Sequence, residues 1–247
     1  MANYKIVIQY DGTRYSGWQV QKNADDTIQG ILENAISEVA GEHVDLIGSG
    51  RTDAGVHAIG QVANFHIDAT RKTDEELLEL INSKLPNDIA VIAIEKVDGR
   101  FHARYNAVSK TYRYRIHTSN IANVFERRYA YYYLDKALDV QKMREAAALM
   151  EGTHDFKSFC SNKHMKKSSV RTVTKIEITQ DEKEIVIDYT GDGFLQNMIR
   201  IMTGTLIEVG NGSRNVNDIP GILEGENREL AGYTAPPQGL CLMKVEY

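Results

Sequence analysis

One short segment combines glycines with residues that could carry out chemistry: Gly48–Ala58, with the sequence GSGRTDAGVHA. Its three glycines permit tight turns and the close approach of another chain. Arg51 and Asp53 stand two residues apart, so one turn can direct both side chains into one cleft. Three interpretations compete: a phosphate-binding loop, a structural turn in which Asp53 caps the backbone, and a catalytic carboxylate beside a cationic group. The phosphate motifs GxxxxGK[ST] and GxGxxG opening a helix are absent, and the spacing leaves the other two interpretations open.

Basic side chains are concentrated in two runs, although the net charge of the chain is −5. Residues 100–128 contain seven lysines and arginines and a single acidic residue, Glu126. Residues 157–175 contain six lysines and arginines and no acidic residue. These are Arg100, Arg104, Lys110, Arg113, Arg115, Arg127 and Arg128, then Lys157, Lys163, Lys166, Lys167, Arg171 and Lys175. A protein that is acidic overall can still present a basic cleft to a phosphate backbone. The alternative is a solvated surface, but two such runs flanking the motifs below favour RNA.

The elements that would position these residues are strands alternating with helices. Hydrophobic spacing predicts strands at 4–10, 44–49, 61–67, 89–97, 111–117, 129–133, 170–179, 184–189 and 241–247. It predicts helices at 27–40, 74–85, 140–151 and 194–209, and a short helix near 218–223. Thr27 and Gly41 suit the start and the end of the first helix, and Pro86 suits a stop after the second.

Both halves of the chain follow the same order of elements: an aromatic-rich strand, a helix ended by glycine, more strands, and another helix. This order predicts an α+β fold of two similar halves, each an antiparallel sheet with helices on one face, packed around a central basic cleft. We place the boundary near residue 105. Residues 1–105 would form an N-terminal domain that carries the Asp53 loop, and residues 106–247 a C-terminal domain that completes the active-site cleft.

The composition bears on the cellular compartment. Cys160 and Cys241 are far apart and form no CxxC pattern, no run approaches the roughly 20 apolar residues of a membrane helix, and the start reads as a strand. We therefore expect a cytoplasmic protein with no membrane contact. The histidines lack the spacing of metal ligands, so we expect no metal and assign them structural roles. His57 is close enough in sequence to Asp53 to order its loop.

The segment GRTDAGVHA resembles the catalytic-loop signature of the tRNA pseudouridine synthase A (TruA) family. Further segments resemble that family in the same order: YDGTRYSGWQVQ, TIQGILENAI, LPNDIAV, FHARYNAVSKTYRYRI, GTHDFKSF, GFLQNMIRIMTGTLIEVG and GLCLMKVEY. The resemblance covers essentially the whole chain. It implies isomerisation of uridine to pseudouridine at positions 38–40 of the tRNA anticodon stem-loop, by a homodimer that one RNA bridges, with RNA shape read through phosphate and 2′-hydroxyl contacts.

The resemblance also implies a role for five residues. Asp53 matches the catalytic aspartate, and Arg200 matches the arginine that pairs with it. Tyr112 matches the tyrosine that stacks on the target base. Arg51 matches the arginine that helps to flip or replace that base, and Leu240 matches an apolar residue that lines the pocket.

These residue types suit the reaction. It breaks the uracil–ribose C–N bond and joins a ring carbon to the same sugar carbon, with no atom gained or lost, so no cofactor is required. An ionised carboxylate can attack C1′ or remove a proton from C2′, and the sequence leaves both routes open. In a site that excludes water, burial raises the pKa of a carboxyl group and a close arginine lowers it.

The target uridine must also leave the helical stack, and stacking on an aromatic ring returns about 1–3 kcal/mol of that cost. Tyr112 and Tyr114 are two residues apart on a predicted strand, so both face one side and Arg113 and Arg115 face the other. We expect one of the two tyrosines to serve only in packing.

Two other hypotheses remain at this point. The first is a non-catalytic RNA-binding or RNA-chaperone protein on the same scaffold, which would require the catalytic carboxylate to be lost, whereas Asp53 is present. The second is an α+β enzyme for a small molecule or a phosphate that uses the loop at 48–55. It predicts that tRNA does not bind.

Overall fold

The structure is a computed structural model of the 247-residue chain, and it describes residues 1–21, 23–24, 26–68, 72–121, 123–162 and 164–247. The chain forms two compact units: unit 1 is residues 1–108 with 241–247, and unit 2 is residues 109–240. Lys163, counted in the second basic run, lies outside the described residues. Within them, no helix is long and apolar enough to cross a membrane.

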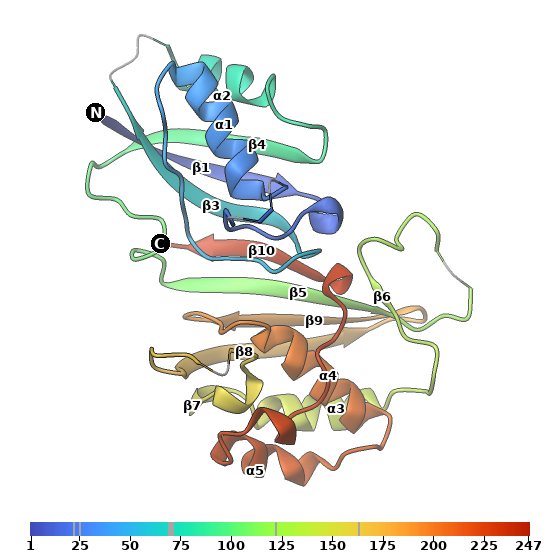
Figure 1. Cartoon of the computed structure of the whole chain (residues 1–247). Coiled ribbons are helices and arrows are strands. Elements are labelled where there is room, and N and C mark those ends of the chain that lie inside the picture. The colour runs from blue at the N-terminus through green and yellow to red at the C-terminus, as the bar shows by residue number, and fades with distance from the viewer. Residues whose placement is uncertain (22, 25, 69–71, 122, 163) are drawn as a thin grey trace. The chain divides into compact units, whose positions relative to one another are not determined.

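Unit 1 contains a five-stranded sheet (Figure 1). Its strands are β1 (Ala2–Tyr10), β2 (Ile47–Gly48), β3 (His57–Ile67), β4 (Ile89–Val97) and β10 (Leu240–Glu246). The strands β4, β1 and β3 pair antiparallel in that order, and β2 adds to β3. β10 pairs with β3 in parallel, so this sheet is mixed and not purely antiparallel as expected. Parallel pairing requires a long connection, and all of unit 2 lies between β3 and β10 in the sequence.

The two helices of unit 1, α1 (Ile28–Ala40) and α2 (Asp74–Asn82), lie on the same face of its sheet (Figure 1). The Thr27 side chain caps α1, which ends at Gly41 with a φ of 75°, as predicted. Thr73 and Glu76 form a capping box on α2. α2 ends three residues before the predicted bound, where the Asn82 carboxamide bonds the backbone of β4.

Unit 2 has the same kind of architecture, with a sheet in the order β5-β9-β8-β7 and β6 beside β5. The strands are β5 (Ser109–His117), β6 (Tyr131–Tyr132), β7 (Gly152–Asp155), β8 (Val170–Gln180) and β9 (Glu184–Gly191). β7 was not predicted. The helices are α3 (Val140–Ala148), α4 (Met198–Gly210) and α5 (Ile219–Glu224). Short 3₁₀ turns occupy residues 12–14, 157–159, 216–218, 228–230 and 237–239.

Helix α4 is buried on nearly all sides, as a core helix without a polar face must be. It begins four residues later than predicted because Asn197 takes a left-handed conformation with a φ of 60°, which breaks the helical path from Phe194. The structure confirms the predicted α+β fold of two similar halves. The central cleft stays a prediction.

Candidate active site

The loop that carries Asp53 leaves β2 and is bound at once by β3. The Ser49 amide donates to the Val62 carbonyl at 2.7 Å, and the Ser49 hydroxyl donates to the Gln61 carboxamide at the same distance. The other end of the Gln61 carboxamide donates to the Gly50 carbonyl at 3.3 Å. Ser49 and Gln61 are fully buried, so these bonds stabilise the start of the loop away from water.

The chain segment after β1 holds the centre of the loop. The Trp18 amide donates to the Thr52 carbonyl at 3.1 Å, and the Tyr10 and Thr52 hydroxyls lie 2.8 Å apart. Gly17, with a φ of +95°, lies so close that a Cβ on it would meet the Thr52 oxygen at 2.8 Å. Only glycine combines that conformation with that approach.

His57 orders the far end of the loop, as predicted. Its Nδ1 accepts a hydrogen bond of 3.0 Å from the Gly12 amide, and its ring is buried. The same Nδ1 lies 3.3 Å from the Asp11 carboxylate, but an ion pair there would need a proton on Nδ1. Because the Nδ1 lone pair already accepts from Gly12, Nδ1 carries no proton, and the contact with Asp11 is not an ion pair.

These anchors determine which way the neighbouring side chains turn. Thr52 points inward and is buried, whereas Arg51 is exposed and Asp53 is half-buried. The Val56 amide closes the turn on the Asp53 carbonyl at 3.2 Å, and Gly55 takes a φ of +78° to allow it. Arg51 and Asp53 therefore lie on one rigid turn of unit 1.

Asp88 anchors the segment that supports this turn. Its carboxylate accepts hydrogen bonds of 2.5 Å from the Arg14 guanidinium and from the Tyr15 hydroxyl. Burial disfavours the charge of Asp88, but these two donors outweigh burial and hold the pKa of that carboxyl below its ordinary value. Burial, with the Asp88 bond, raises the pKa of Tyr15 to about 12.

The two tyrosines of β5 have different surroundings. Both are buried and Arg113 and Arg115 face the other side, as the alternation predicts. Tyr112 contacts Phe194 edge to face at 5.4 Å. The Tyr114 hydroxyl donates to the Pro236 carbonyl at 2.7 Å, and burial raises its pKa. Tyr114 therefore has a packing role.

Several cations of the two basic runs are already neutralised by acids. Arg113 binds Asp188 at 2.8 Å, and Arg115 binds both Glu126 and Glu184 at 2.5 Å. In the second run, Lys157 and Lys175 pair with Glu226 and Glu177. The charge that unit 2 can offer to a phosphate backbone is therefore smaller than the residue counts indicate.

Arg200 is positioned by two hydrogen bonds within unit 2. Its Nε donates to the Ala235 carbonyl and its Nη1 to the Asn197 carboxamide, both at 2.7 Å. The left-handed Asn197 that starts α4 is thus also the residue that orients this guanidinium. Sequence reasoning missed this role of Asn197, although it directly precedes the segment MIR.

Leu240 is positioned by the same part of unit 2. Arg200 holds Ala235, Tyr114 holds Pro236, and Gly239 lies against the Tyr114 ring, where a Cβ would come within 2.7 Å of it. Leu240 follows directly and is buried. Tyr112, Arg200 and Leu240 are thus held by unit 2, and Arg51 and Asp53 by unit 1.

The part of the chain that the structure describes contains no group of three or more His, Cys, Asp or Glu arranged to hold a metal ion.

Comparison with known proteins gives the family. A family model described as tRNA pseudouridine synthase matches residues 6–106 and 146–247. The chain belongs to the tRNA pseudouridine synthase family. The match to this family includes Arg51, Asp53, Arg200 and Leu240, whereas Tyr112 lies between its two segments.

Full-length relatives in the family are similar to the chain throughout. A protein of Acetivibrio thermocellus named tRNA pseudouridine synthase A is 46% identical over 247 residues, with both chains covered completely. A protein of Bacillus cereus strain ZK / E33L named tRNA pseudouridine synthase A 2 is 45% identical over the same length and coverage. A tRNA pseudouridine synthase A of Limosilactobacillus reuteri is 45% identical, with all of this chain and 97% of that protein covered.

Proposed function

We propose that this chain isomerises uridine to pseudouridine in tRNA, at positions 38–40 of the anticodon stem-loop. The observation that carries the proposal is the Asp53 turn. Backbone and buried side-chain bonds hold it from both sides, and Asp53 is a half-buried residue in a chain of this family. A group that is held rigidly and is partly shielded from water is what covalent or proton-transfer catalysis requires.

In this proposal each of the five residues has a task in the isomerisation. The Asp53 carboxylate attacks C1′ of the ribose or removes the C2′ proton, and Arg200 pairs with it and keeps it ionised. Tyr112 stacks on the everted uracil, Leu240 lines the pocket beside it, and Arg51 helps to flip the base or takes its place in the helix. No cofactor takes part.

The atoms of the reaction balance without a second substrate. The bond from N1 of uracil to C1′ breaks, the base turns, and a bond from C5 to C1′ forms. The hydrogen of C5 leaves as a proton, and N1 gains one. Loss of that hydrogen gives the reaction a direct readout.

The decisive experiment uses anticodon stem-loop RNA that carries tritium at C5 of uridine. We expect the wild-type chain to release tritium, and Asp53→Asn to abolish release while the affinity for the RNA changes little. Asp45→Asn, an exposed aspartate of the same unit, is the matched control and should stay active. An active Asp53→Asn variant would remove Asp53 from the chemistry.

The same assay separates the alternatives. A wild-type protein that binds the RNA but releases no tritium would be a non-catalytic RNA-binding protein. A protein that does not bind the RNA would support the third hypothesis, an enzyme that acts on a small molecule or a phosphate.

We further infer that the domain of residues 1–105 supplies the catalytic loop and that residues 106–247 complete the basic cleft.

We infer that the chain acts as a cytoplasmic homodimer in which one RNA contacts both subunits. Light scattering should then give twice the mass of one chain. Mixed dimers of wild-type and Asp53→Asn chains should retain part of the activity. A monomer with full activity would contradict this assembly.

A further inference from the structure

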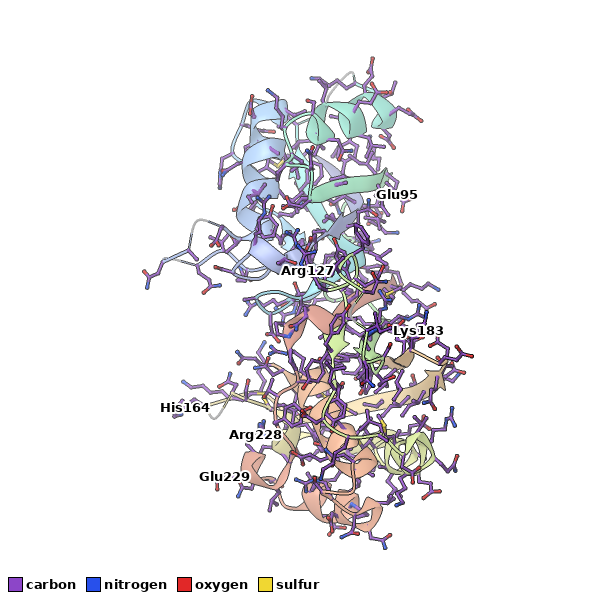
Figure 2. All side chains as sticks on the ribbon, turned by 90° about the vertical axis from the view of Figure 1, so that its right-hand side faces the viewer. Glu95, Arg127, His164, Lys183, Arg228 and Glu229 are labelled. Carbon is purple, nitrogen blue, oxygen red and sulfur yellow. The ribbon has the colours of Figure 1, made fainter. Side chains whose placement is uncertain are left out.

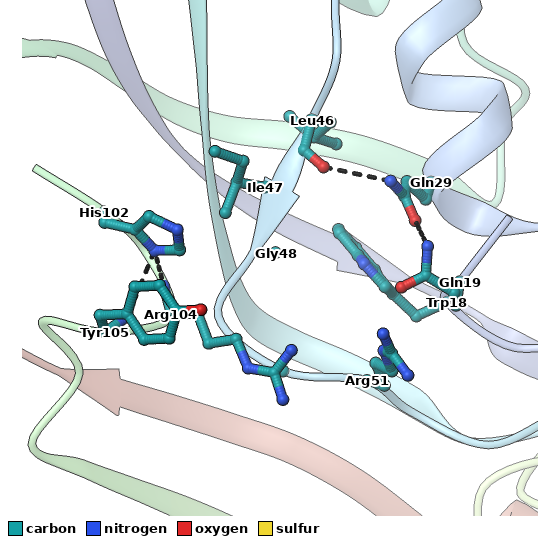
Figure 3. Close-up of a pocket in the computed structure, with 11 residues that line it drawn as sticks. Trp18, Gln19, Gln29, Leu46, Ile47, Gly48, Arg51, His102, Arg104 and Tyr105 are labelled. Carbon is teal, nitrogen blue, oxygen red and sulfur yellow. Dashed lines mark hydrogen bonds between the residues drawn. The ribbon is translucent and has the colours of Figure 1, made fainter.

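A pocket of about 230 Å³ opens in unit 1 beside Arg51 (Figure 3). His102 and Tyr105 lie on one side, and Trp18 and Gln19 lie on the other with Arg51 next to Trp18; the Arg104 side chain extends from the first side toward Arg51 (Figure 3). Asp53 does not line this pocket. None of the five tasks proposed above uses its aromatic side or Arg104.

The turn that carries the aromatic residues is anchored in the core of unit 1. The Ala103 amide donates to the buried Asn64 carboxamide at 2.8 Å, and the Ala103 carbonyl accepts from the Tyr247 hydroxyl at 2.8 Å. Asn3, which is also buried, donates to the Phe101 carbonyl at 2.9 Å. A turn held through buried polar groups keeps its geometry when a ligand arrives.

Tyr105 forms an exposed aromatic platform on this turn. The residue is 77% exposed, yet one face of its ring lies on the His102 ring, with centroids 4.1 Å apart and planes 31° from parallel. Nδ1 of His102 accepts from the amides of Arg104 and Tyr105 at 3.2 and 3.3 Å, which fixes the imidazole beneath the phenol. A large exposed ring that is rigidly supported is a surface on which a nucleobase can stack.

The two arginines at the pocket differ from the other arginines of the chain. The side chains of Arg51 and Arg104 make no hydrogen bond or ion pair with any residue that the structure describes. Every other described arginine has an interaction: Arg14, Arg100, Arg113, Arg115, Arg127, Arg128, Arg144, Arg171, Arg200, Arg214 and Arg228. Two unneutralised guanidiniums beside one pocket suit a phosphate.

The opposite side offers a fixed polar group. The side-chain nitrogen Nε2 of Gln19 donates to the carboxamide oxygen of Gln29 at 2.7 Å. The Nε2 of Gln29 in turn donates to the Leu46 carbonyl at 3.1 Å. These bonds orient the Gln19 carboxamide, whose oxygen accepts no hydrogen bond within the described part of the chain. That oxygen can accept from an amino or imino group of a base.

We propose that this pocket binds a second, unpaired nucleotide of the RNA substrate, separate from the target uridine. Its base stacks on Tyr105, and its phosphate lies between Arg51 and Arg104. The proposal rests on the proposed function, since the nucleotide belongs to the same RNA. It assigns to Tyr105 and Arg104 the task of holding the RNA while Asp53 acts on another residue of it.

The test measures the affinity for anticodon stem-loop RNA and, separately, the single-turnover rate of tritium release at saturating RNA. We expect Tyr105→Ala to weaken binding about tenfold, and Tyr105→Phe to bind like the wild type because the ring remains. Arg104→Gln should weaken binding by a similar factor. The rate at saturation should stay within about twofold in every variant, because these residues do not touch the reacting atoms.

Arg100→Gln is the matched control, since Arg100 is an exposed arginine on the preceding turn and lies outside the pocket. Its affinity should equal that of the wild type. Equal affinities of Tyr105→Ala and the wild type would overturn the proposal, and so would an equal loss in Tyr105→Phe, which would implicate the hydroxyl in place of the ring.

A binding readout without catalysis separates this proposal from the proposed function. Trp18 is the single tryptophan of the chain and lines the pocket, so its fluorescence should change when the RNA is added to the Asp53→Asn protein. The Tyr105→Ala change should shift that titration about tenfold. If the wild type releases no tritium but this titration still depends on Tyr105, the proposed function fails and the nucleotide site stands. If tritium is released and the titration does not depend on Tyr105, only the site fails.

Discussion

At Gly17 the conformation of one residue controls the placement of Asp53. Its φ of +95° and the 2.8 Å approach to the Thr52 oxygen leave no room for a side chain. Gly41 shares the left-handed conformation, with a φ of +75°, but a Cβ there would meet nothing within 4 Å. The two glycines therefore separate the cost of the backbone conformation from the cost of the close approach.

We predict that Gly17→Ala and Gly41→Ala each lose about 1 kcal/mol of stability from the left-handed backbone. Gly17→Ala should lose further stability and should also lower kcat, on the order of 10²-fold for each ångström by which Asp53 shifts. Thermal unfolding and tritium release measure the two effects. Equal activities of the two variants would show that the Gly17 contact does not position the catalytic loop.

Tyr114 tests the division of roles on β5. Its hydroxyl is buried and bonds Pro236, so Tyr114→Phe should cost about 1 kcal/mol of unfolding free energy by leaving that carbonyl unsatisfied. The activity of the variant at temperatures below its unfolding should stay close to that of the wild type. A large loss of kcat with unchanged stability would assign Tyr114 a catalytic task that we give to Tyr112.

At the scale of elements, the segment between β1 and α1 acts as a clamp on the Asp53 loop. Its residues Gly12, Gly17 and Trp18 contact the loop. The segment is itself bound to Asp88 through Arg14 and Tyr15. Asp88, which directly precedes β4, therefore supports the Asp53 turn between β2 and β3 through this segment.

The lowered pKa of Asp88 predicts a pH dependence of stability. A carboxyl group whose pKa is lower in the folded state stabilises the protein above its unfolded pKa, near 4, and this contribution is lost as pH falls through the folded value. We expect Asp88→Asn to cost about 1–2 kcal/mol at pH 7. The difference between wild type and variant should hold from pH 7 to about 5 and shrink below about 4.

Urea unfolding at several pH values measures this difference. Asp135→Asn changes an exposed aspartate that has no ion-pair partner among the described residues, and it should be neutral throughout. A stability difference for Asp88→Asn that grows on acidification would show that the carboxylate destabilises the clamp.

For the molecule as a whole, RNA affinity should depend on the cations that no acid neutralises. Lys157 and Lys175 are paired, whereas Lys166 and Lys167 are exposed and have no ion-pair partner among the described residues. His164 of the same segment projects from unit 2 (Figure 2). This segment is the part of the second basic run that we expect to contact phosphates.

We predict that the affinity for tRNA falls steeply with salt, and that changing both Lys166 and Lys167 to Gln lowers the slope of log K against log salt by about 1–2. Changing both Lys157 and Lys175 to Gln removes the same charge and should alter the slope much less. Equal effects of the two double variants would mean that overall charge alone governs binding. A flat salt response of the wild type would remove the basic runs from RNA recognition.

The sequence by itself determined the elements whose signals are local. The spacing of apolar residues and the caps at Thr27 and Gly41 predicted α1 within one residue, and the alternation of β4 predicted its bounds. The identity of the glycine-rich segment also pointed to Asp53 without the fold, because that segment is contiguous in the chain.

Only the tertiary structure decided what depends on contacts between distant residues. The parallel pairing of β10 with β3 and the ion pairs that neutralise Arg113 and Arg115 join parts of the chain that no local pattern relates. The pocket of Tyr105 and Arg104 likewise unites the Arg51 loop with a turn some fifty residues later. Local preferences act within a few residues, whereas such contacts are selected by the packing of the whole unit.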